Sequence, residues 1–534
     1  MTDFAPELRL TLEQKVGQTL MIAFEGTALT PALQQMIVDK HIGGVVLFEG
    51  NVESPRQLAQ LTFDIQRTAK ESGHPGLFVA IDQEGGLVTR LREARGFTEF
   101  PSAMAVAATN DVENASLIAG MMGSELSALG LNTNFAPVLD VNNNPANPVI
   151  GIRAFSSDPY RVADYGAVFA AALQGQNILA IGKHFPGHGD TTLDSHTALP
   201  TVAHNRAHLE AVELLPFKAC LTADIAGIMS AHITFPAIDP TPGRPATLST
   251  HALTKLLREE MGFEGLVCTD SLEMGALAAS GYPQPLAAAM AFEAGADLLL
   301  FNANHAEHRQ AFDLILSKVQ NGEIPGQRLD DSLRRLLTTK KKFGLIDPKP
   351  IHPGTAAAHV GTSDHRARSR RIAAQAITLL RDDVKVLPLV STHPVVIETP
   401  TAAGLAERLG ATLIPIGEQP THAEIISIVA ALRSDQPIVV GVADVLAHPQ
   451  QVALVNALME TKAPVIVVGL HNPYDLLPFA RLPTLVAAYG ANEPALEALA
   501  RVLSGRARPQ GRLPVTLPSL YHIGYGLSNF VGQS

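Results

Sequence analysis

The sequence is poor in cysteine and in long hydrophobic runs. Its 534 residues include only Cys220 and Cys268, each in an apolar stretch, which indicates buried thiols in a reducing compartment and excludes a disulfide framework. No uninterrupted apolar run reaches the roughly 18 residues that a membrane-spanning helix needs. The N-terminus also lacks a basic segment followed by an apolar one, so no secretory signal is expected. We therefore expect a cytoplasmic protein with no membrane partner.

Positive charge is also scarce. The formal net charge is −11, and the longest basic run is the three lysines at 340–342. A nucleic-acid binder needs a clustered surface of lysine and arginine to neutralise phosphates. A short basic run is more typical of a solvated helix end. The charge pattern thus excludes a nucleic-acid partner.

The length predicts two domains, because one hydrophobic core seldom grows beyond about 250 to 300 residues. Short apolar runs alternate with helix-patterned stretches over the first 300 residues. Such alternation predicts parallel strands joined by right-handed helical crossovers, and eight runs predict a closed (β/α)8 barrel of the TIM type. An open doubly wound sheet is the alternative. The eight runs are QTLMIAF, IGGVVLF, GLFVAI, LNTNFAPVLDV, ILAIGKHF, IAGIMSAH, GLVCTD and ADLLLFNA.

The remainder of the chain predicts a linker and a second α/β unit. The stretch DPKPIHPG at 347–354 is rich in proline and follows a predicted helix, which is typical of a linker. We predict a catalytic barrel over 1–345, a connecting segment over 346–370 and a smaller α/β sandwich domain over 371–534. In the last, a helix at 369–382 should precede four buried strands of a parallel sheet. It contains no glycine-rich phosphate fingerprint, so no nucleotide or other cofactor is expected.

Polar and charged residues follow the predicted barrel strands. Active sites of barrel enzymes lie on the loops at the carboxyl ends of the strands, so these side chains are candidates for the site. They are Asp82, Gln83 and Glu84 after the third strand, Asp140 and Asn142 after the fourth, Lys183 and His184 after the fifth, His232 after the sixth, Asp270 after the seventh and Asn302 after the eighth.

The loop KHFPGHGDTTLDSH at 183–196 has the densest chemistry. Its proline and glycines prevent a helix. Asp194 and His196 stand two apart, so an extended backbone places both side chains on one face. There the carboxylate can fix the tautomer of the imidazole and raise its pKa, as an acid/base group requires. Asp270 can face this pair across the pocket as a nucleophile. This is the arrangement of retaining glycoside cleavage, except that the proton donor is a histidine instead of a carboxylic acid.

Two other interpretations of the loop remain open. His184, His188 and His196 can be metal ligands, or they can form a structural cluster. Barrel metallohydrolases usually draw ligands from several strand ends with an early His-x-His pair, and the first strands here have none. No metal ion is therefore expected.

Four motifs together resemble the glycoside hydrolase family 3 β-N-acetylglucosaminidases of the NagZ type. They are the loop at 183–196, AIDQEGGLVTR at 80–90, GIRAFSSDP at 151–159 and TDSLEMGA at 269–276. The long loop is the specific part. The resemblance extends over nearly the whole chain, since GRARPQGRLPVTLP at 505–518 is similar to the α/β sandwich domain of the two-domain members.

The resemblance implies a role for each matching residue. Asp270 takes the position of the nucleophile, and Asp194 and His196 take those of the acid/base dyad. Leu87 departs from the pattern, because many relatives carry arginine there. Arginine and lysine donors with an aspartate acceptor suit a polyol. The residues implied to hold the sugar are Asp82, Arg90, Arg153, Lys183 and His184.

The implied activity is retaining, exo-acting cleavage of terminal β-GlcNAc from small carbohydrate fragments of cell wall or chitin, as in peptidoglycan recycling. Alternatives are a phosphorylase that uses inorganic phosphate, since an imidazole does not repel phosphate as a second carboxylate would, and a β-glucosidase. The substrate's acetamido group can also replace the nucleophile, with Asp270 stabilising an oxazoline. A metal-dependent hydrolase and a catalytically silent sugar-binding sensor are the alternatives from other classes.

Overall fold

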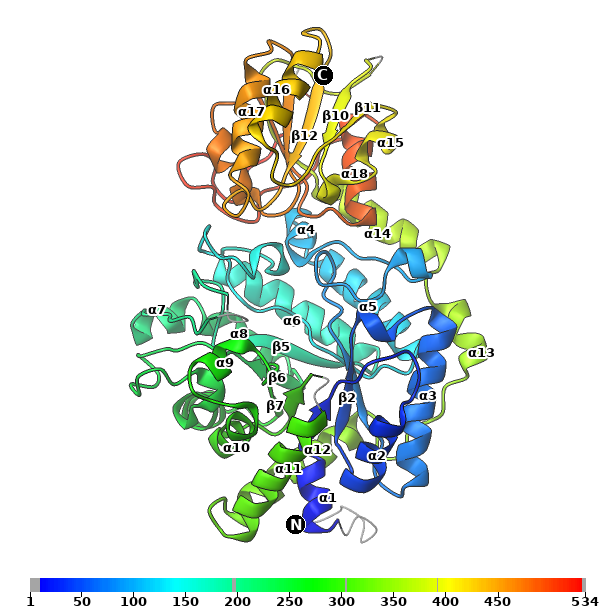
Figure 1. Cartoon of the computed structure of the whole chain (residues 1–534), viewed down its shortest axis with the longest axis vertical. Coiled ribbons are helices and arrows are strands. Elements are labelled where there is room, and N and C mark those ends of the chain that lie inside the picture. The colour runs from blue at the N-terminus through cyan, green and yellow to red at the C-terminus, as the bar shows by residue number, and fades with distance from the viewer. Residues whose placement is uncertain (1–9, 195–197, 303–304, 391, 531–534) are drawn as a thin grey trace.

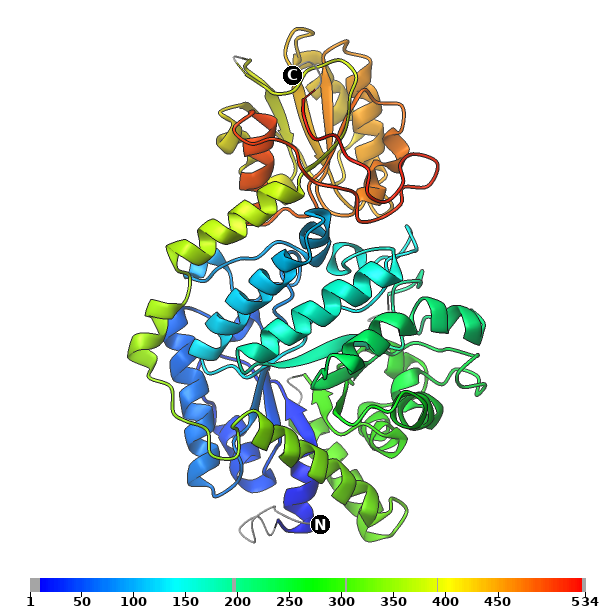
Figure 2. The same cartoon turned by 180° about the vertical axis from the view of Figure 1, so that it is seen from behind.

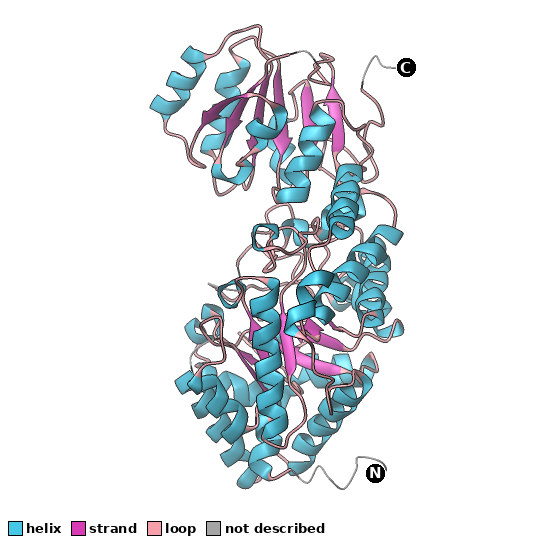
Figure 3. Cartoon of the chain, turned by 90° about the vertical axis from the view of Figure 1, so that its right-hand side faces the viewer, coloured by secondary structure: helices cyan, strands magenta, loops and turns pink. Residues whose placement is uncertain are grey.

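The computed structural model shows a barrel joined to a separate α/β unit (Figure 1). It describes residues 10–194, 198–302, 305–390 and 392–530. The long helix α14 (Ser363–Ala376) leads from the barrel into the second unit, as the reverse view shows (Figure 2). Coloured by secondary structure, each unit has its strands inside and its helices outside (Figure 3). The predicted combination of a barrel and a smaller α/β domain is confirmed.

Eight parallel strands form the barrel. Their order in the sheet is β7-β6-β5-β4-β3-β2-β1-β8. The ring closes between β7 and β8, where Cys268 pairs with Leu298 and the Thr269 amide donates to the Leu298 carbonyl over 3.0 Å. The strands are β1 (Leu20–Ile22), β2 (Gly44–Leu47), β3 (Phe78–Ile81), β4 (Thr133–Asn134), β5 (Leu179–Phe185), β6 (Gly227–Ser230), β7 (Leu266–Thr269) and β8 (Leu299–Phe301).

The barrel strands are apolar on both faces, which is why the sequence shows unbroken apolar runs. In β2, Val45 and Leu47 pack outward against the helices, while Val46 points into the barrel interior. Phe78 of β3 and Cys268 of β7 belong to the same interior cluster. Side chains therefore fill the barrel, and only its loops are free to form a site.

Helices cover the barrel from outside. In α3, Ser54 caps the first turn by accepting from the Gln57 amide, and Pro55 occupies the first helical position. The barrel helices are α1 (Leu12–Gly17), α2 (Pro31–Lys40), α3 (Pro55–Glu71), α4 (Ala103–Ala108), α5 (Glu113–Ala128), α6 (Pro159–Gly175), α7 (Arg206–Ala211), α8 (Leu214–Thr222), the π-helix η5 (His251–Glu260), α9 (Gly275–Ala279), α10 (Gln284–Ala294), α11 (His305–Gln320) and α12 (Gly326–Lys342).

The C-terminal unit has a sheet of six strands in the order β11-β10-β12-β13-β14-β9. Helices α15 (Leu405–Leu409), α16 (His422–Ala431), α17 (Gln450–Met459) and α18 (Glu493–Leu503) pack around it, and α13 (Pro353–Ala356) precedes α14. The strands are β9 (Thr378–Asp382), β10 (Val395–Glu398), β11 (Thr412–Pro415), β12 (Ile438–Val442), β13 (Val465–Gly469) and β14 (Thr484–Ala487).

Two predictions about this sheet were wrong. The expected helix at 369–382 ends at Ala376, and its last residues form β9, which runs antiparallel to β14. A short apolar stretch such as Leu379–Leu380 fits either pattern, so periodicity alone cannot separate them. The second wrong prediction is the number of strands, since the sheet has six instead of four. Besides β9, the edge strand β11 was missed, because it is largely exposed and has no buried apolar run. The predicted boundaries at 345 and 371 stay predictions.

The two units share an apolar contact. Met104, Ala105 and Ala108 of α4 belong to the core cluster of the C-terminal unit. Polar contacts surround it: the Tyr474 hydroxyl donates to the Asn142 carbonyl over 2.9 Å. Asn142 follows β4, so the second unit rests on the rim of the barrel where the candidate residues lie.

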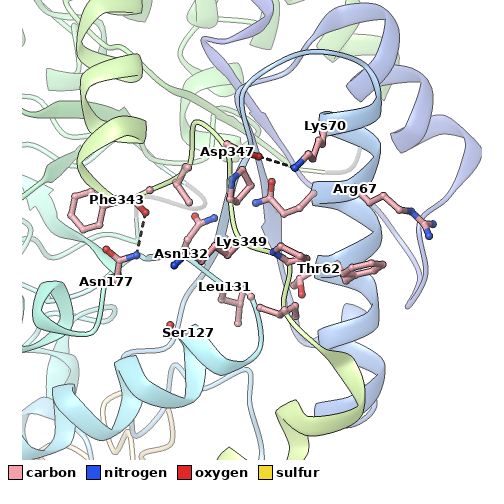
Figure 4. A pocket seen from close by; sticks show the side chains of 18 residues that line it. Thr62, Arg67, Lys70, Ser127, Leu131, Asn132, Asn177, Phe343, Asp347 and Lys349 are labelled. Atoms are coloured by element: carbon pink, nitrogen blue, oxygen red, sulfur yellow. Dashed lines mark hydrogen bonds and ion pairs between the residues drawn. The ribbon is translucent and has the colours of Figure 1, made fainter. Parts of the chain in front are cut away.

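A cavity of about 700 Å³ lies at the opposite end of the barrel (Figure 4). Asn132 and Asn177, which line it, come just before β4 and β5, at the amino ends of the strands. The ion pair between Lys70 and Asp347, 2.8 Å long, lies at its edge. This cavity is therefore separate from the candidate active site.

Two further expectations concern composition. Cys220 and Cys268 are free and buried, and burial raises the pKa of both thiols. This confirms the interpretation of buried thiols. Among the residues that the structure describes, we find no helix with the length and apolarity that membrane crossing requires.

Candidate active site

Glu84 is the centre of an ion network at the mouth of the barrel. Its two oxygens accept from Arg153, Nε and Nη2, each over 2.9 Å. The Lys183 ammonium lies 2.6 Å from Glu84 Oε1 and 2.8 Å from Asp82 Oδ1. Arg90 Nη2 lies 3.6 Å from the other Asp82 oxygen. Residues from the loop after β3, from the segment after β4 and from β5 itself thus meet in one polar cradle, which comprises Asp82, Glu84, Arg90, Arg153 and Lys183.

Burial and the neighbouring charges have opposite effects on the charge states in this cradle. Burial opposes ionisation of Glu84, yet the charges of Arg153 and Lys183 hold its pKa well below the usual range. Burial likewise opposes the charge of Lys183, but the carboxylates of Asp82 and Glu84 raise its pKa. Glu84 and Lys183 are therefore charged at neutral pH. The cradle offers donors and acceptors in fixed positions.

Asp140 fixes the start of the loop at 183–196. Its carboxylate accepts the backbone amides of His184, over 3.2 Å, and His188, over 2.6 Å, and lies 2.7 Å from His184 Nδ1. Burial opposes its charge, but the neighbouring His184 lowers its pKa. Gly189 cannot carry a side chain here, because a Cβ would lie 1.8 Å from the Val141 carbonyl oxygen. These contacts explain why the loop needs its glycine.

Asp270 follows β7 and is held ionised. Its Oδ1 accepts the Ser271 amide over 2.7 Å. Burial opposes its charge. The electrostatic effects of His184 and His232, the hydrogen bond from the Ser271 amide and the charge of Lys183 nevertheless lower its pKa. A partly buried carboxylate that stays charged can serve as a nucleophile. Because β7 belongs to the same ring of strands as β3 and β5, Asp270 lies on the same rim of the barrel as Asp82 and Lys183.

The far end of the loop is described in part. Asp194 is partly buried, and its carbonyl accepts the Ala198 amide over 3.0 Å. His196 lies outside the described residues, so the predicted pairing of Asp194 with His196 stays a prediction.

The residues predicted from the sequence come together to a large extent. Arg90 and Lys183 lie within 3.6 Å of Asp82, and Arg153 Nη2 lies 3.4 Å from His184 Nε2. Glu84 joins the two groups, because it pairs with both Lys183 and Arg153. The sequence reasoning placed Glu84 and Asp140 at strand ends but gave neither a role. In the sequence, the only indication of a role for these two residues is their position after a strand. The residues that they contact are distant in the chain.

The contacts of His184 and His188 disfavour a metal in this loop. His184 Nδ1 faces Asp140, and its Nε2 faces the guanidinium of Arg153, which would repel a metal ion. His188 Nδ1 lies 2.9 Å from Thr191 Oγ1. Burial and the neighbouring charge of His184 lower the pKa of His188 to about 4, so its ring is neutral. His188 thus shapes the loop.

A second cavity, of about 390 Å³, opens at the carboxyl ends of β1, β2 and β8. Phe24, Phe48 and Asn302 line it. The Arg90 guanidinium lies 5.6 Å from the centre of the Phe48 ring, so this cavity adjoins the cradle. It offers an apolar surface beside the polar site.

A closed parallel barrel with ionised side chains gathered at the carboxyl ends of its strands has the position and chemistry of a barrel-enzyme active site. Comparison with known proteins gives the particular family. The profile of the glycosyl hydrolase family 3 N terminal domain matches residues 11–339, and that of the C-terminal domain matches 440–523. The chain belongs to glycosyl hydrolase family 3.

Known relatives match over nearly the full length. The chain is 32% identical to beta-hexosaminidase A of Pseudoalteromonas piscicida, over 96% of this chain and 98% of that protein. It is 29% identical to a beta-N-acetylglucosaminidase/beta-glucosidase of Cellulomonas fimi, over 94% and 93%. A solved family 3 beta-N-acetylglucosaminidase from Paenibacillus sp. str. FPU-7 has 37% identity and a TM-score of 0.88, over 95% and 99%.

Proposed function

We propose that this glycoside hydrolase is a retaining, exo-acting β-N-acetylglucosaminidase that removes terminal β-GlcNAc from fragments of cell-wall or chitin type. The observation that carries the proposal is the position of Asp270 at the carboxyl end of β7, on the same barrel rim as the cradle that contains Asp82, Arg153 and Lys183. The names of two relatives that match over nearly their full length, a beta-hexosaminidase and a beta-N-acetylglucosaminidase, support an N-acetylhexosamine as the sugar.

In the first step, a carboxylate oxygen of Asp270 bonds to C1 of the sugar as the bond from C1 to the leaving oxygen breaks. His196, oriented by Asp194, donates its proton to that oxygen. In the second step, water attacks C1, His196 takes the proton of the water, and the bond to Asp270 breaks. Two inversions leave the product in the original β configuration.

The cradle holds the sugar through its hydroxyls. Asp82 accepts hydrogen bonds, while Lys183, Arg90 and Arg153 donate them, and the His184 ring lies against Arg153 in the same subsite. Because Lys183 and Arg153 are anchored on Glu84 before substrate arrives, little reorganisation is needed on binding. The cavity beside Arg90 is where we place the leaving group.

Phosphorolysis is the second candidate, because a histidine acid/base does not repel phosphate. We expect wild-type enzyme on an aryl β-N-acetylglucosaminide to release free GlcNAc at the same rate with and without inorganic phosphate. Chromatography of the products distinguishes GlcNAc from its 1-phosphate. A phosphate-dependent sugar 1-phosphate would overturn hydrolysis. The matching aryl β-glucoside is the control for the sugar, and an equal or higher rate on it would overturn the preference for GlcNAc.

His196→Ala tests the acid. We expect a loss of about 10²- to 10⁴-fold in kcat/KM with poor leaving groups such as alkyl glycosides. With dinitrophenol as the leaving group, the first step should change little, because that oxygen departs without a proton. Because a folding defect would lower the rates on both substrates equally, the comparison of the two substrates within one variant also controls for folding. Equal losses on both would remove His196 as the acid.

A further inference from the structure

Three side chains outside the active site converge after the loop at 183–196. His204 lies just before α7, His208 on α7 and Glu213 at the start of α8. One ligand atom of each lies within 4.8 Å of the others. The rings of His204 and His208 stack with their centres 3.8 Å apart. Histidine nitrogens and a carboxylate oxygen at this spacing are the donors that a divalent transition metal prefers.

Glu213 lacks the partners that a buried carboxylate needs. Its side chain is 3% exposed, and among the described residues neither of its oxygens has a hydrogen-bond partner. His208 Nε2 lies 3.7 Å from Glu213 Oε1, which is too long for a hydrogen bond, and it also has no hydrogen-bond partner among the described residues. Leaving these atoms unsatisfied is costly, and a cation between them would satisfy all three.

Asp190 gives His204 the orientation that a metal ligand requires. Its Oδ2 lies 2.6 Å from His204 Nε2, which leaves Nδ1 of His204 free to coordinate. A carboxylate on the second nitrogen of a ligating histidine is the usual support of a metal site. Asp190 belongs to the loop at 183–196. Gly187 of the same loop packs on Glu213, since a Cβ there would lie 2.8 Å from Glu213 Cβ.

We propose that His204, His208 and Glu213 bind one divalent transition-metal ion of the zinc type, with Asp190 as a positioning residue, and that this ion braces the loop carrying Asp194 and His196. Binding draws the three donor atoms to about 3.4 Å apart, the edge of a tetrahedron with bonds near 2.1 Å, and leaves a position for water. The ion is structural and takes no part in the reaction. This site was not predicted from the sequence, because the metal ligands considered there were the histidines of the loop itself.

The site is tested by equilibrium dialysis of metal-stripped, full-length protein against Zn²⁺, with the metal counted by mass spectrometry. We expect one tightly held equivalent. His208→Asn and Glu213→Gln should each lose it, and Asp190→Asn should weaken binding by about 10- to 100-fold. His251→Asn is the matched control, a half-exposed histidine 3.7 Å from a buried aspartate oxygen. Stoichiometric binding that survives both ligand variants, or no binding by the wild type, would overturn the site.

Two readouts are independent of catalysis. The visible absorption of Co²⁺ in place of Zn²⁺ should show a four- or five-coordinate site in the wild type and lose intensity in His204→Asn, whose half-exposed position tolerates the change. Hydrogen exchange at 187–194 should slow when Zn²⁺ is added. Binding without slower exchange would keep the site and overturn the brace. Neither result depends on which glycoside the enzyme cleaves, so failure here leaves the proposed function intact.

Discussion

Asp270→Asn is expected to reduce turnover of aryl β-N-acetylglucosaminides by at least about 10⁴-fold, because the amide cannot form or release a glycosyl ester. Unlike Glu84, Asp270 has no ion pair in the described structure that its loss would break, and its Oδ1 bond to the Ser271 amide can be kept by the asparagine oxygen. The fold should therefore survive. The measurement is kcat and KM together with thermal unfolding.

Glu273→Gln is the matched control for this result. Glu273 follows three residues later in the same loop, and its carboxylate accepts from Gln284 Nε2 over 3.0 Å and lies 3.5 Å from His308. Glu273→Gln removes one negative charge, as Asp270→Asn does, and we expect its activity to stay within a few fold of the wild type. Near wild-type turnover by Asp270→Asn, or equal losses in both variants, would remove Asp270 as the nucleophile.

Glu84→Gln is expected to have the second largest effect, on stability and on activity. The change leaves the buried Lys183 and Arg153 without their shared carboxylate, and breaking a buried pair from one side costs about 3 to 5 kcal/mol. A displacement of the two cations by about 1 Å lowers kcat/KM by about 10²-fold. Denaturant unfolding and steady-state kinetics measure both effects.

The pH dependence of stability gives this variant a second readout. The pKa of Glu84 is depressed in the folded protein, so its contribution is present above the ordinary carboxyl pKa of about 4.3 and is lost as the pH falls below it. Glu84→Gln should therefore flatten the loss of stability on acidification. Glu323→Gln is the control, since its exposed pair with Lys318 contributes about 0 to 1 kcal/mol. Equal destabilisation by the two variants would contradict the role of Glu84.

The barrel was predictable because its strands are buried on both faces. Val45 and Leu47 face helices while Val46 faces the interior, so the sequence shows continuous apolar runs that periodicity detects. The edge strand β11 has no buried face, and β9 continues the apolar pattern of α14. Neither carried a local signal, and both were missed.

The site was predictable where chemistry follows a strand directly. Asp82 and Asp270 directly follow β3 and β7, and Lys183 lies near the end of β5. The barrel geometry brings such strand ends together. Glu84 was at the right place but received no role, because its partner Arg153 is 69 residues away and only the fold joins them. The metal ligands His204 and His208 were missed for a similar reason: their third partner, Glu213, opens a different helix.

The most direct test of the mechanism is to trap the glycosyl enzyme. A β-N-acetylglucosaminyl fluoride with a second fluorine at C5 slows both steps by destabilising the oxocarbenium-like transition state, while the good leaving group lets the first step proceed. Mass spectrometry of the protein should then show one added sugar, and the labelled peptide should carry it on Asp270. The account would be contradicted if the enzyme turned over the reagent and no labelled protein were detected, as expected for an oxazoline pathway. A label on a residue other than Asp270 would also contradict it.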